Sequence, residues 1–126
     1  MLVDCWAWVE FFEGSEKGAK IMELMRNETN LYVSSLTLAE VANWCVKNSK
    51  TPVDVYLSAI KTNAAVFDVG ERTAEIAGKN LSTMRKRSPG IGMVDAILYS
   101  QAALMRLPLL TGDPHFKHLE NVVFVD

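Results

Sequence analysis

The sequence predicts an α/β fold of three layers, in which helices cover both faces of a central, mainly parallel sheet of four to five strands. Two observations predict it. Short apolar runs alternate with longer segments of helical apolar spacing along the whole chain, and such alternation is typical of parallel strands joined by right-handed helical crossovers. The chain of 126 residues suits one domain, since domains most often contain about 100–150 residues.

The predicted elements follow from local signals. Each strand is a short apolar run, and the five runs are 1–3, 31–33, 65–67, 107–111 and 122–125. Ser15 is expected to cap a helix, and Pro52 suits the first turn of another. The six expected helices are 6–12, 16–26, 37–46, 52–61, 71–87 and 93–106. We find no internal repeat or linker, so one α/β domain accounts for residues 1–126.

The composition of the chain excludes several classes of protein. With 49% hydrophobic and 22% charged residues, the chain is an ordinary globular protein. A net charge of -2 argues against a purely electrostatic binder of nucleic acid, although it is compatible with an acidic metal site. Cys5 and Cys45 have no CxxC spacing, which favours reduced thiols and a cytoplasmic location. The first residues do not resemble a signal peptide, and no apolar run is long enough to span a bilayer.

Four acids stand where an α/β fold binds ligands. Asp4 follows the first predicted strand, and Asp113 follows the fourth. Glu40 and Asp95 lie in the predicted first turns of two helices. Because ligands bind beyond the carboxyl ends of parallel strands, we expect the four side chains to meet at one edge of the sheet.

Such a meeting of carboxylates favours a divalent metal. Two carboxylates about 5 Å apart repel by about 3 kcal/mol at an effective dielectric near 20, and a cation offsets that repulsion. Oxygen ligands favour Mg²⁺ or Mn²⁺ over zinc. Ions of this kind activate water in phosphodiester hydrolysis.

Four short motifs carry a resemblance to a known family. They read Val3-Asp4, Thr37-Leu38-Ala39-Glu40, Gly92-Met93-Val94-Asp95 and Leu110-Thr111-Gly112-Asp113. In this order and spacing, the set resembles the PIN-domain fold, especially toxin ribonucleases of the VapC type. The resemblance covers the whole chain, and the ordered set is more specific than any single motif.

The resemblance implies a metal-dependent endoribonuclease. It implies that Asp4, Glu40, Asp95 and Asp113 hold Mg²⁺ or Mn²⁺ and position the attacking water, and that Thr111 supports a metal ligand or a phosphate. Similar family members are homodimers that a small antitoxin holds inactive, so RNA, a second copy and an antitoxin are the expected partners. The chain departs from the family pattern at Trp6, where many members have Asn or Ser, and at Pro114-His115, where many have a further acid.

Each acid also has a plain structural interpretation. Thr37 and Glu40 match a capping box, and Asp4 and Asp113 are common turn residues. Asp95 suits the N-terminal turn of a helix because of the helix dipole.

Other groups of residues have two interpretations. A basic run is either a solvated helix end or a contact to the RNA backbone, with Arg72 less certainly on the same surface. The aromatic residues of the first helix exceed what one sheet is expected to cover, which predicts a dimer or a bound partner segment. His115 and His118 are expected on the surface rather than on a metal. The basic run is Lys79, Arg85, Lys86 and Arg87, and the aromatic residues are Trp6, Trp8, Phe11 and Phe12.

Three other functions have some support in the sequence. The main alternative is a non-catalytic PIN-like module that binds RNA or protein. A phosphatase of the haloacid type requires Asp-x-Asp, whereas the chain has Asp4-Cys5-Trp6. A dinucleotide site is excluded because Asp95 occupies the third glycine position of the GxGxxG pattern.

Overall fold

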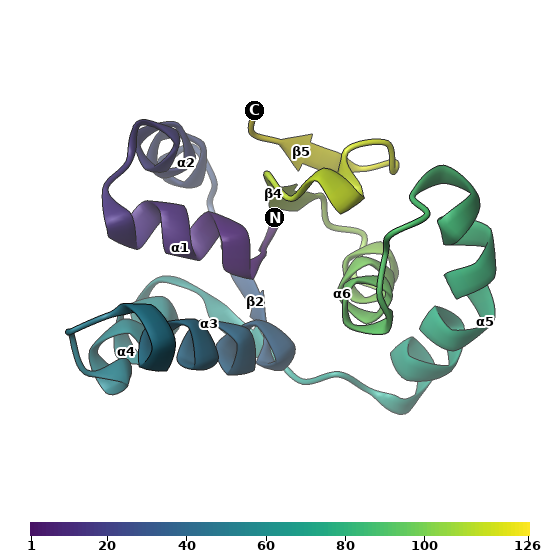
Figure 1. The fold of residues 1–126 in the computed structure, drawn as a ribbon, viewed down its shortest axis with the longest axis horizontal. Helices are drawn as coiled ribbons and strands as arrows, with labels where there is room; N and C mark the ends of the chain where they lie inside the picture. The colour runs from purple at the N-terminus through teal and green to yellow at the C-terminus, as the bar shows by residue number, and fades with distance from the viewer.

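The computed structural model describes all 126 residues and contains strands and helices in alternation (Figure 1). The strands are β1 (Leu2–Val3), β2 (Tyr32–Ser34), β3 (Ala65–Phe67), β4 (Leu109–Thr111) and β5 (Val122–Phe124). The helices are α1 (Cys5–Glu13), α2 (Glu16–Arg26), α3 (Ser35–Asn48), α4 (Val53–Asn63), α5 (Glu71–Arg87) and α6 (Met93–Leu104), and a single 3₁₀ turn, η1, spans Pro114–Phe116.

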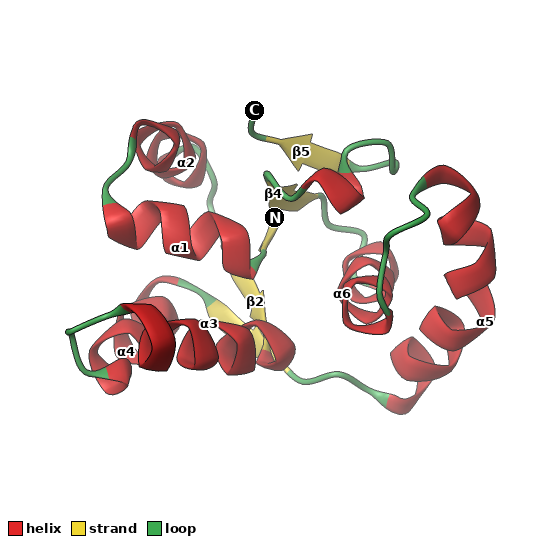
Figure 2. Cartoon of the chain, viewed as in Figure 1, coloured by secondary structure: helices red, strands yellow, loops and turns green.

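The sheet has five strands in the order β3-β2-β1-β4-β5, and every pair is parallel. Helices α1 to α4 lie on one side of it and α5 and α6 on the other, as Figure 2 shows. The predicted three-layer α/β/α class is therefore confirmed. The sheet is wholly parallel, where the sequence predicted a mainly parallel one.

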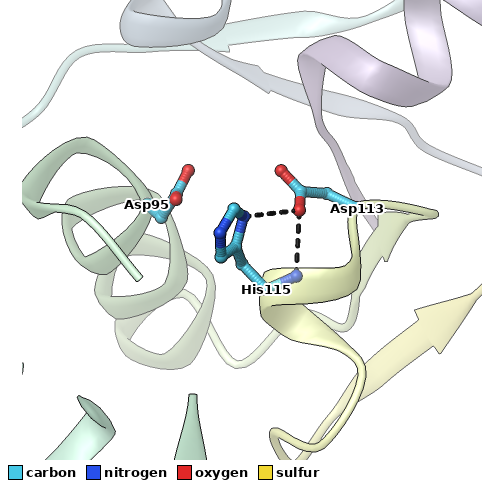
Figure 3. A group of neighbouring side chains, drawn as sticks. All are labelled: Asp95, Asp113 and His115. Carbon is cyan, nitrogen blue, oxygen red and sulfur yellow. Dashed lines mark hydrogen bonds and ion pairs between the residues drawn. The ribbon is translucent and has the colours of Figure 1, made fainter. Parts of the chain in front are cut away.

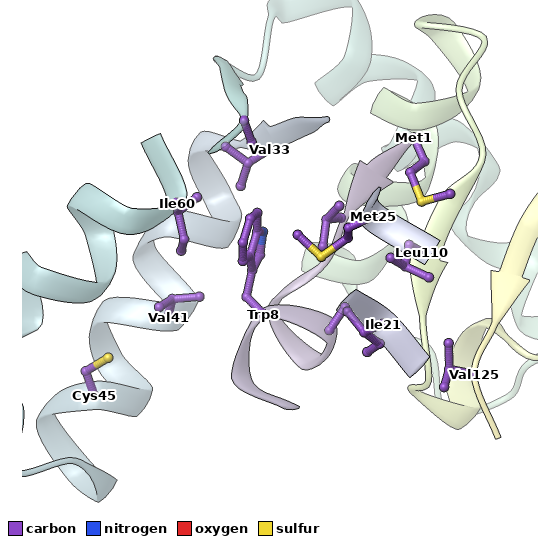
Figure 4. Close-up of a cluster of buried hydrophobic side chains, with 13 residues drawn as sticks. Met1, Trp8, Ile21, Met25, Val33, Val41, Cys45, Ile60, Leu110 and Val125 are labelled. Atoms are coloured by element: carbon purple, nitrogen blue, oxygen red, sulfur yellow. The ribbon is translucent and has the colours of Figure 1, made fainter. Parts of the chain in front are cut away.

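Two hydrophobic clusters hold the layers together. Neighbouring residues of the central strands point to opposite faces, so Val3 and Leu110 join the cluster beneath α1 to α4, whereas Leu2 and Leu109 join the one beneath α5 and α6. Figure 4 shows the larger cluster, with the fully buried Trp8 among side chains from the sheet and the surrounding helices. This double coverage fixes the central strands, and thereby the residues that follow them.

The aromatic residues of α1 are covered by the chain itself. Helix α2 packs along one side of α1 and α3 along another. Phe12 meets Tyr56 of α4 with ring centroids 4.6 Å apart, and Trp8 stacks on Phe12 at 6.0 Å. None of the four aromatic side chains is exposed. These aromatic residues therefore do not by themselves require a second chain, because α2, α3 and α4 supply cover, and the expected dimer stays a prediction.

Helix α3 begins earlier than predicted. Its first residue is Ser35, and its N-cap is Ser34, whose hydroxyl accepts the N–H of Leu36 at 3.2 Å. Thr37 is already inside the helix and fully buried, so the expected capping box with Glu40 does not form. Glu40 lies in the second turn of α3, where the sequence placed it in the first.

Smaller differences, of one or two residues, concern the ends of several elements. Strand β4 begins at Leu109 rather than at residue 107, and α6 ends at Leu104 rather than at 106. Arg106 adopts a left-handed backbone, with φ of 55°, which ends the helical path. None of the helices combines the length and the hydrophobicity that crossing a bilayer requires.

The helix-start correction predicts opposite effects for two substitutions. Ser34→Ala removes the cap and should lower the free energy of unfolding by about 1 kcal/mol. Thr37→Val should leave it unchanged or raise it by up to about 1 kcal/mol, because the buried Thr37 hydroxyl has no hydrogen-bond partner. Denaturant unfolding of both variants measures the difference. A Thr37→Val protein less stable than Ser34→Ala would restore Thr37 as the cap.

Candidate metal centre

Asp4 and Thr111 form the buried base of the acidic cluster. Asp4 is 4% exposed and is the N-cap of α1, with Oδ1 accepting the N–H of Ala7 at 2.8 Å. Its Oδ2 accepts a hydrogen bond from the Thr111 hydroxyl, whose oxygen accepts the backbone N–H of Asp113 at 3.0 Å. One threonine therefore connects two of the predicted site acids.

Burial governs the protonation of Asp4. Loss of hydration raises the pKa of its carboxyl from 3.8 to about 7, although the hydrogen bonds from Thr111 and Ala7 act in the opposite direction. The charges of Asp113 and Glu40 act in the same direction as the loss of hydration and contribute to this value. Asp4 thus lies near both acids.

Glu40 and Asp95 complete the group from two other helices. Both side chains are half-buried. Desolvation raises the pKa of Glu40, and the charges of Asp95 and Asp113 add to that effect. Desolvation and the charge of Asp113 likewise raise the pKa of Asp95. The structure therefore brings all four predicted acids together, as their mutual effects on protonation show.

A histidine lies within this group. One ligand atom each from Asp95, Asp113 and His115 fall within 4.8 Å of one another. Figure 3 shows the imidazole between the two carboxylates, and its Nδ1 lies 2.8 Å from Oδ1 of Asp113. The ring is exposed, as the sequence led us to expect, but its place beside two site acids was missed. The available signal was its position two residues after Asp113, in a turn that Asp113 caps.

Trp6 packs against the backbone of the Asp113 turn. A Cβ placed on Gly112 would lie within 2.6 Å of three carbons of the Trp6 ring. The ammonium group of Lys17 lies 5.6 Å from the centre of the same ring. Glycine at position 112 therefore allows Trp6 to hold the turn that carries Asp113, a contact that sequence reasoning did not identify.

Cys5 is unsuited to nucleophilic chemistry. Burial, together with the charges of Glu40 and Asp4, raises the pKa of its thiol to about 12. A thiol of this kind stays protonated near neutral pH.

The four residues of the basic run, all in α5, differ in the contacts they make. All four are exposed. Arg85 donates to the carbonyl of Ile91 at 3.1 Å, and so braces the loop that leads to Asp95. Arg87 forms an ion pair with Glu120 at 3.8 Å. Lys79 and Lys86 have neither kind of contact.

The donor set fits a divalent cation. No lysine or arginine forms a salt bridge with any of the four acids, and His115 is the one side chain of basic type that contacts them. Carboxylate oxygens supply the ligands that Mg²⁺ and Mn²⁺ prefer. Asp4 is buried at the base of the group, and Glu40, Asp95 and Asp113 are half-buried above it.

The close contact of Trp6 with Gly112 predicts a steric effect. Gly112→Ala should lower the free energy of unfolding by about 1–3 kcal/mol, because the ring or the turn must move. Gly92→Ala is the matched control, since a Cβ there meets no atom within 4 Å. In a Trp6→Ala background the Gly112 substitution should have little effect. Equal effects of Gly112→Ala in both backgrounds, measured by denaturant unfolding, would contradict the assigned contact.

The raised pKa of Asp4 predicts a pH-dependent stability in the absence of metal. The folded state binds the proton more tightly than the unfolded state, so the stabilisation is complete below pH 3.8 and is lost as the pH rises through about 7. Between pH 4 and pH 8 the loss should be on the order of 4 kcal/mol. Asp4→Asn should flatten this dependence. Unfolding in EDTA across this range tests it, and equal slopes for the two proteins would refute it.

The chain was compared with known proteins. The sequence model of the PIN domain matches residues 1–122. Similar solved structures include a toxin–antitoxin complex from Klebsiella pneumoniae, at 20% identity and a TM-score of 0.77, which covers 99% of this chain and 97% of that one. A comparison with curated proteins found no match.

Two further structures show the same fold. One is VapBC2 from Rickettsia felis bound to a DNA fragment from its promoter, at 18% identity and a TM-score of 0.76, covering 98% of this chain and 95% of that one. The other is VapC20 from Mycobacterium tuberculosis, described as a toxin that cleaves the sarcin–ricin loop, at 18% identity and a TM-score of 0.69, covering 83% and 82% of the two chains. Because the family match spans nearly the whole sequence, the resemblance to the PIN fold is confirmed, and this chain belongs to the PIN domain family.

Proposed function

We propose that the chain is a divalent-metal-dependent endoribonuclease and the toxin of a toxin–antitoxin pair. The observation that carries the proposal is the meeting of Asp4, Glu40, Asp95 and Asp113 beyond the carboxyl ends of the central strands. These acids come from four separate segments and have no basic partner apart from His115. Residues 1–126 act as one PIN domain in this proposal.

The residues of the site have different proposed roles. Asp4, Glu40, Asp95 and Asp113 hold the Mg²⁺ or Mn²⁺ through carboxylate oxygens. The Thr111 hydroxyl fixes the orientation of Asp4 and holds the backbone of Asp113. A bound ion supplies an activated water and neutralises charge that develops on the phosphate. No cysteine nucleophile takes part, because the Cys5 thiol stays protonated.

The shape of the site suits a polymeric substrate. Three of the acids, Glu40, Asp95 and Asp113, are half-buried and so within reach of solvent, and no enclosed cavity is lined by them; a site of this kind admits a chain that extends on both sides of the cleaved bond. The solved structure described as a toxin that cleaves the sarcin–ricin loop supports RNA as the substrate class. We assign contacts to the RNA backbone to four of the exposed basic residues of α5, which are Lys79, Arg85, Lys86 and Arg87.

The partner proteins are proposed from similar structures. Three of them are described as toxin–antitoxin or VapBC complexes, two of which are bound to DNA. We therefore propose a small antitoxin as the inhibitor of this chain, a homodimer as its assembled state and the cytoplasm as its location. The homodimer rests on the family resemblance alone, since α1 is covered within one chain.

Loss of one carboxylate should abolish cleavage without unfolding the protein. Asp95→Asn should reduce the rate of RNA cleavage in Mn²⁺ by at least about a hundredfold, because removing a metal ligand exceeds the effect of changing its supporting partners. Asp54→Asn is the matched control, as Asp54 is an exposed acid in the first turn of α4. Gel analysis of total RNA measures the rate, and circular dichroism confirms the fold.

A cellular assay tests the toxin assignment separately. Expression should arrest growth, and Asp95→Asn should relieve the arrest while Asp54→Asn does not. Equal arrest by the wild type and Asp95→Asn, with no RNA cleaved by either, would instead identify a non-catalytic PIN-like module that binds RNA or protein.

A further inference from the structure

His115 is held in place by three neighbouring features. Its backbone N–H donates to Oδ1 of Asp113 at 2.9 Å, and its Nδ1 lies 2.8 Å from the same oxygen. The next residue, Phe116, is fully buried in the cluster beneath α5 and α6 and anchors the turn. The imidazole also lies against Gly90, where an added Cβ would be 3.0 Å from Nε2. The ring therefore has little freedom to turn away from the acids.

The ring and the two carboxylates lie near the spacing that ligands of one ion have. Two ligand atoms bound at about 2.1 Å and at right angles lie about 3 Å apart. The separation of Nδ1 from Oδ1 of Asp113, 2.8 Å, is close to that value. Asp95 approaches from the facing helix, with a ligand atom of each of the three residues within 4.8 Å of the others (Figure 3).

Charge also favours an imidazole at this position. Asp95 and Asp113 lie beside the ring, and Asp113 is joined to Asp4 through Thr111, so negative charges already repel one another here. A fifth carboxylate would add to that repulsion, whereas a neutral imidazole offers a lone pair without negative charge. Both ions prefer oxygen ligands, but Mn²⁺, as a transition ion, accepts an imidazole nitrogen more readily than Mg²⁺ does.

We propose that His115 is a nitrogen ligand of the metal site and makes the site prefer Mn²⁺ over Mg²⁺. This inference rests on the proposed function, because it assigns a ligand and a metal preference to the same acidic site. Its structural basis is the imidazole fixed between Asp95 and Asp113 by the η1 turn and Gly90. His115 therefore affects the selectivity of the site for one ion over another and its affinity for that ion.

Metal titration tests the preference directly. Calorimetric titrations with Mn²⁺ alone and with Mg²⁺ alone compare the wild type with His115→Ala. Mn²⁺ affinity should fall by about tenfold or more, and Mg²⁺ affinity should change by less than about threefold. His118→Ala is the matched control, because His118 is the other of the two histidines and is also exposed. His115→Asp, which restores an oxygen ligand, should move the preference toward Mg²⁺.

Pulsed electron paramagnetic resonance supplies a readout that does not depend on activity. The Mn²⁺-loaded wild type should show modulation from a coordinated ¹⁴N nucleus, which His115→Ala abolishes and His118→Ala retains. Absence of the nitrogen signal in the wild type would overturn the proposal. So would an equal loss of affinity for both ions in His115→Ala, since that result assigns the residue to positioning Asp113 only.

The two proposals fail in distinguishable ways. Mn²⁺ binding that requires Asp95 but is unchanged in His115→Ala would overturn the ligand assignment and leave the nuclease standing. A wild-type protein that binds no Mn²⁺ would overturn both. Melting curves of each variant in EDTA show whether the fold is intact, so that a loss of binding is assigned to the site.

Discussion

Strands β1 and β4 pair in parallel with Val3 opposite Leu110, and the next residues are Asp4, which follows β1, and Thr111, which ends β4. The backbone N–H of Asp4 donates to the carbonyl of Leu110 at 3.1 Å, which fixes the position of the backbone that carries the carboxylate. The Thr111 hydroxyl then binds that carboxylate and accepts the N–H of Asp113. A change of register by one residue would exchange the faces of the apolar side chains as well as separate these groups. The cores on both sides of the sheet therefore protect the site geometry.

The acidic group opposes the stability of the fold that carries it. Burial and mutual repulsion raise the pKa of Asp4, Glu40 and Asp95, so ionisation of these side chains costs more free energy here than it does in water. Because buried charges are stabilised by partners or metals, the fold and a divalent ion support each other. Side chains such as Trp8, Leu2 and Leu109, which are fully buried, supply the hydrophobic stabilisation that tolerates this arrangement.

Much of the fold was predictable because its signals are local. Apolar runs identified all five strands, and strand order then follows the general behaviour of parallel α/β sheets. Asp4 and Asp113 could be placed beyond strand ends for the same reason. The start of α3 was not predictable in this way, because Ser34 and Thr37 are both good caps. The choice of Ser34 follows from how strand β2 enters the helix, with Thr37 buried against the core.

Features that depend on contacts between distant segments could not be predicted from the sequence. The cover of α1 comes from Tyr56 of α4, some forty residues away along the chain, and no local pattern reveals that contact. The orientation of His115 depends likewise on Gly90, which belongs to the loop between α5 and α6. The sequence correctly placed His115 on the surface. It did not show that tertiary packing directs the ring toward Asp95 and Asp113. The carboxylates are placed by the ends of regular elements, but the ligand that would adjust the metal preference is placed by loops, which vary more easily than the sheet does.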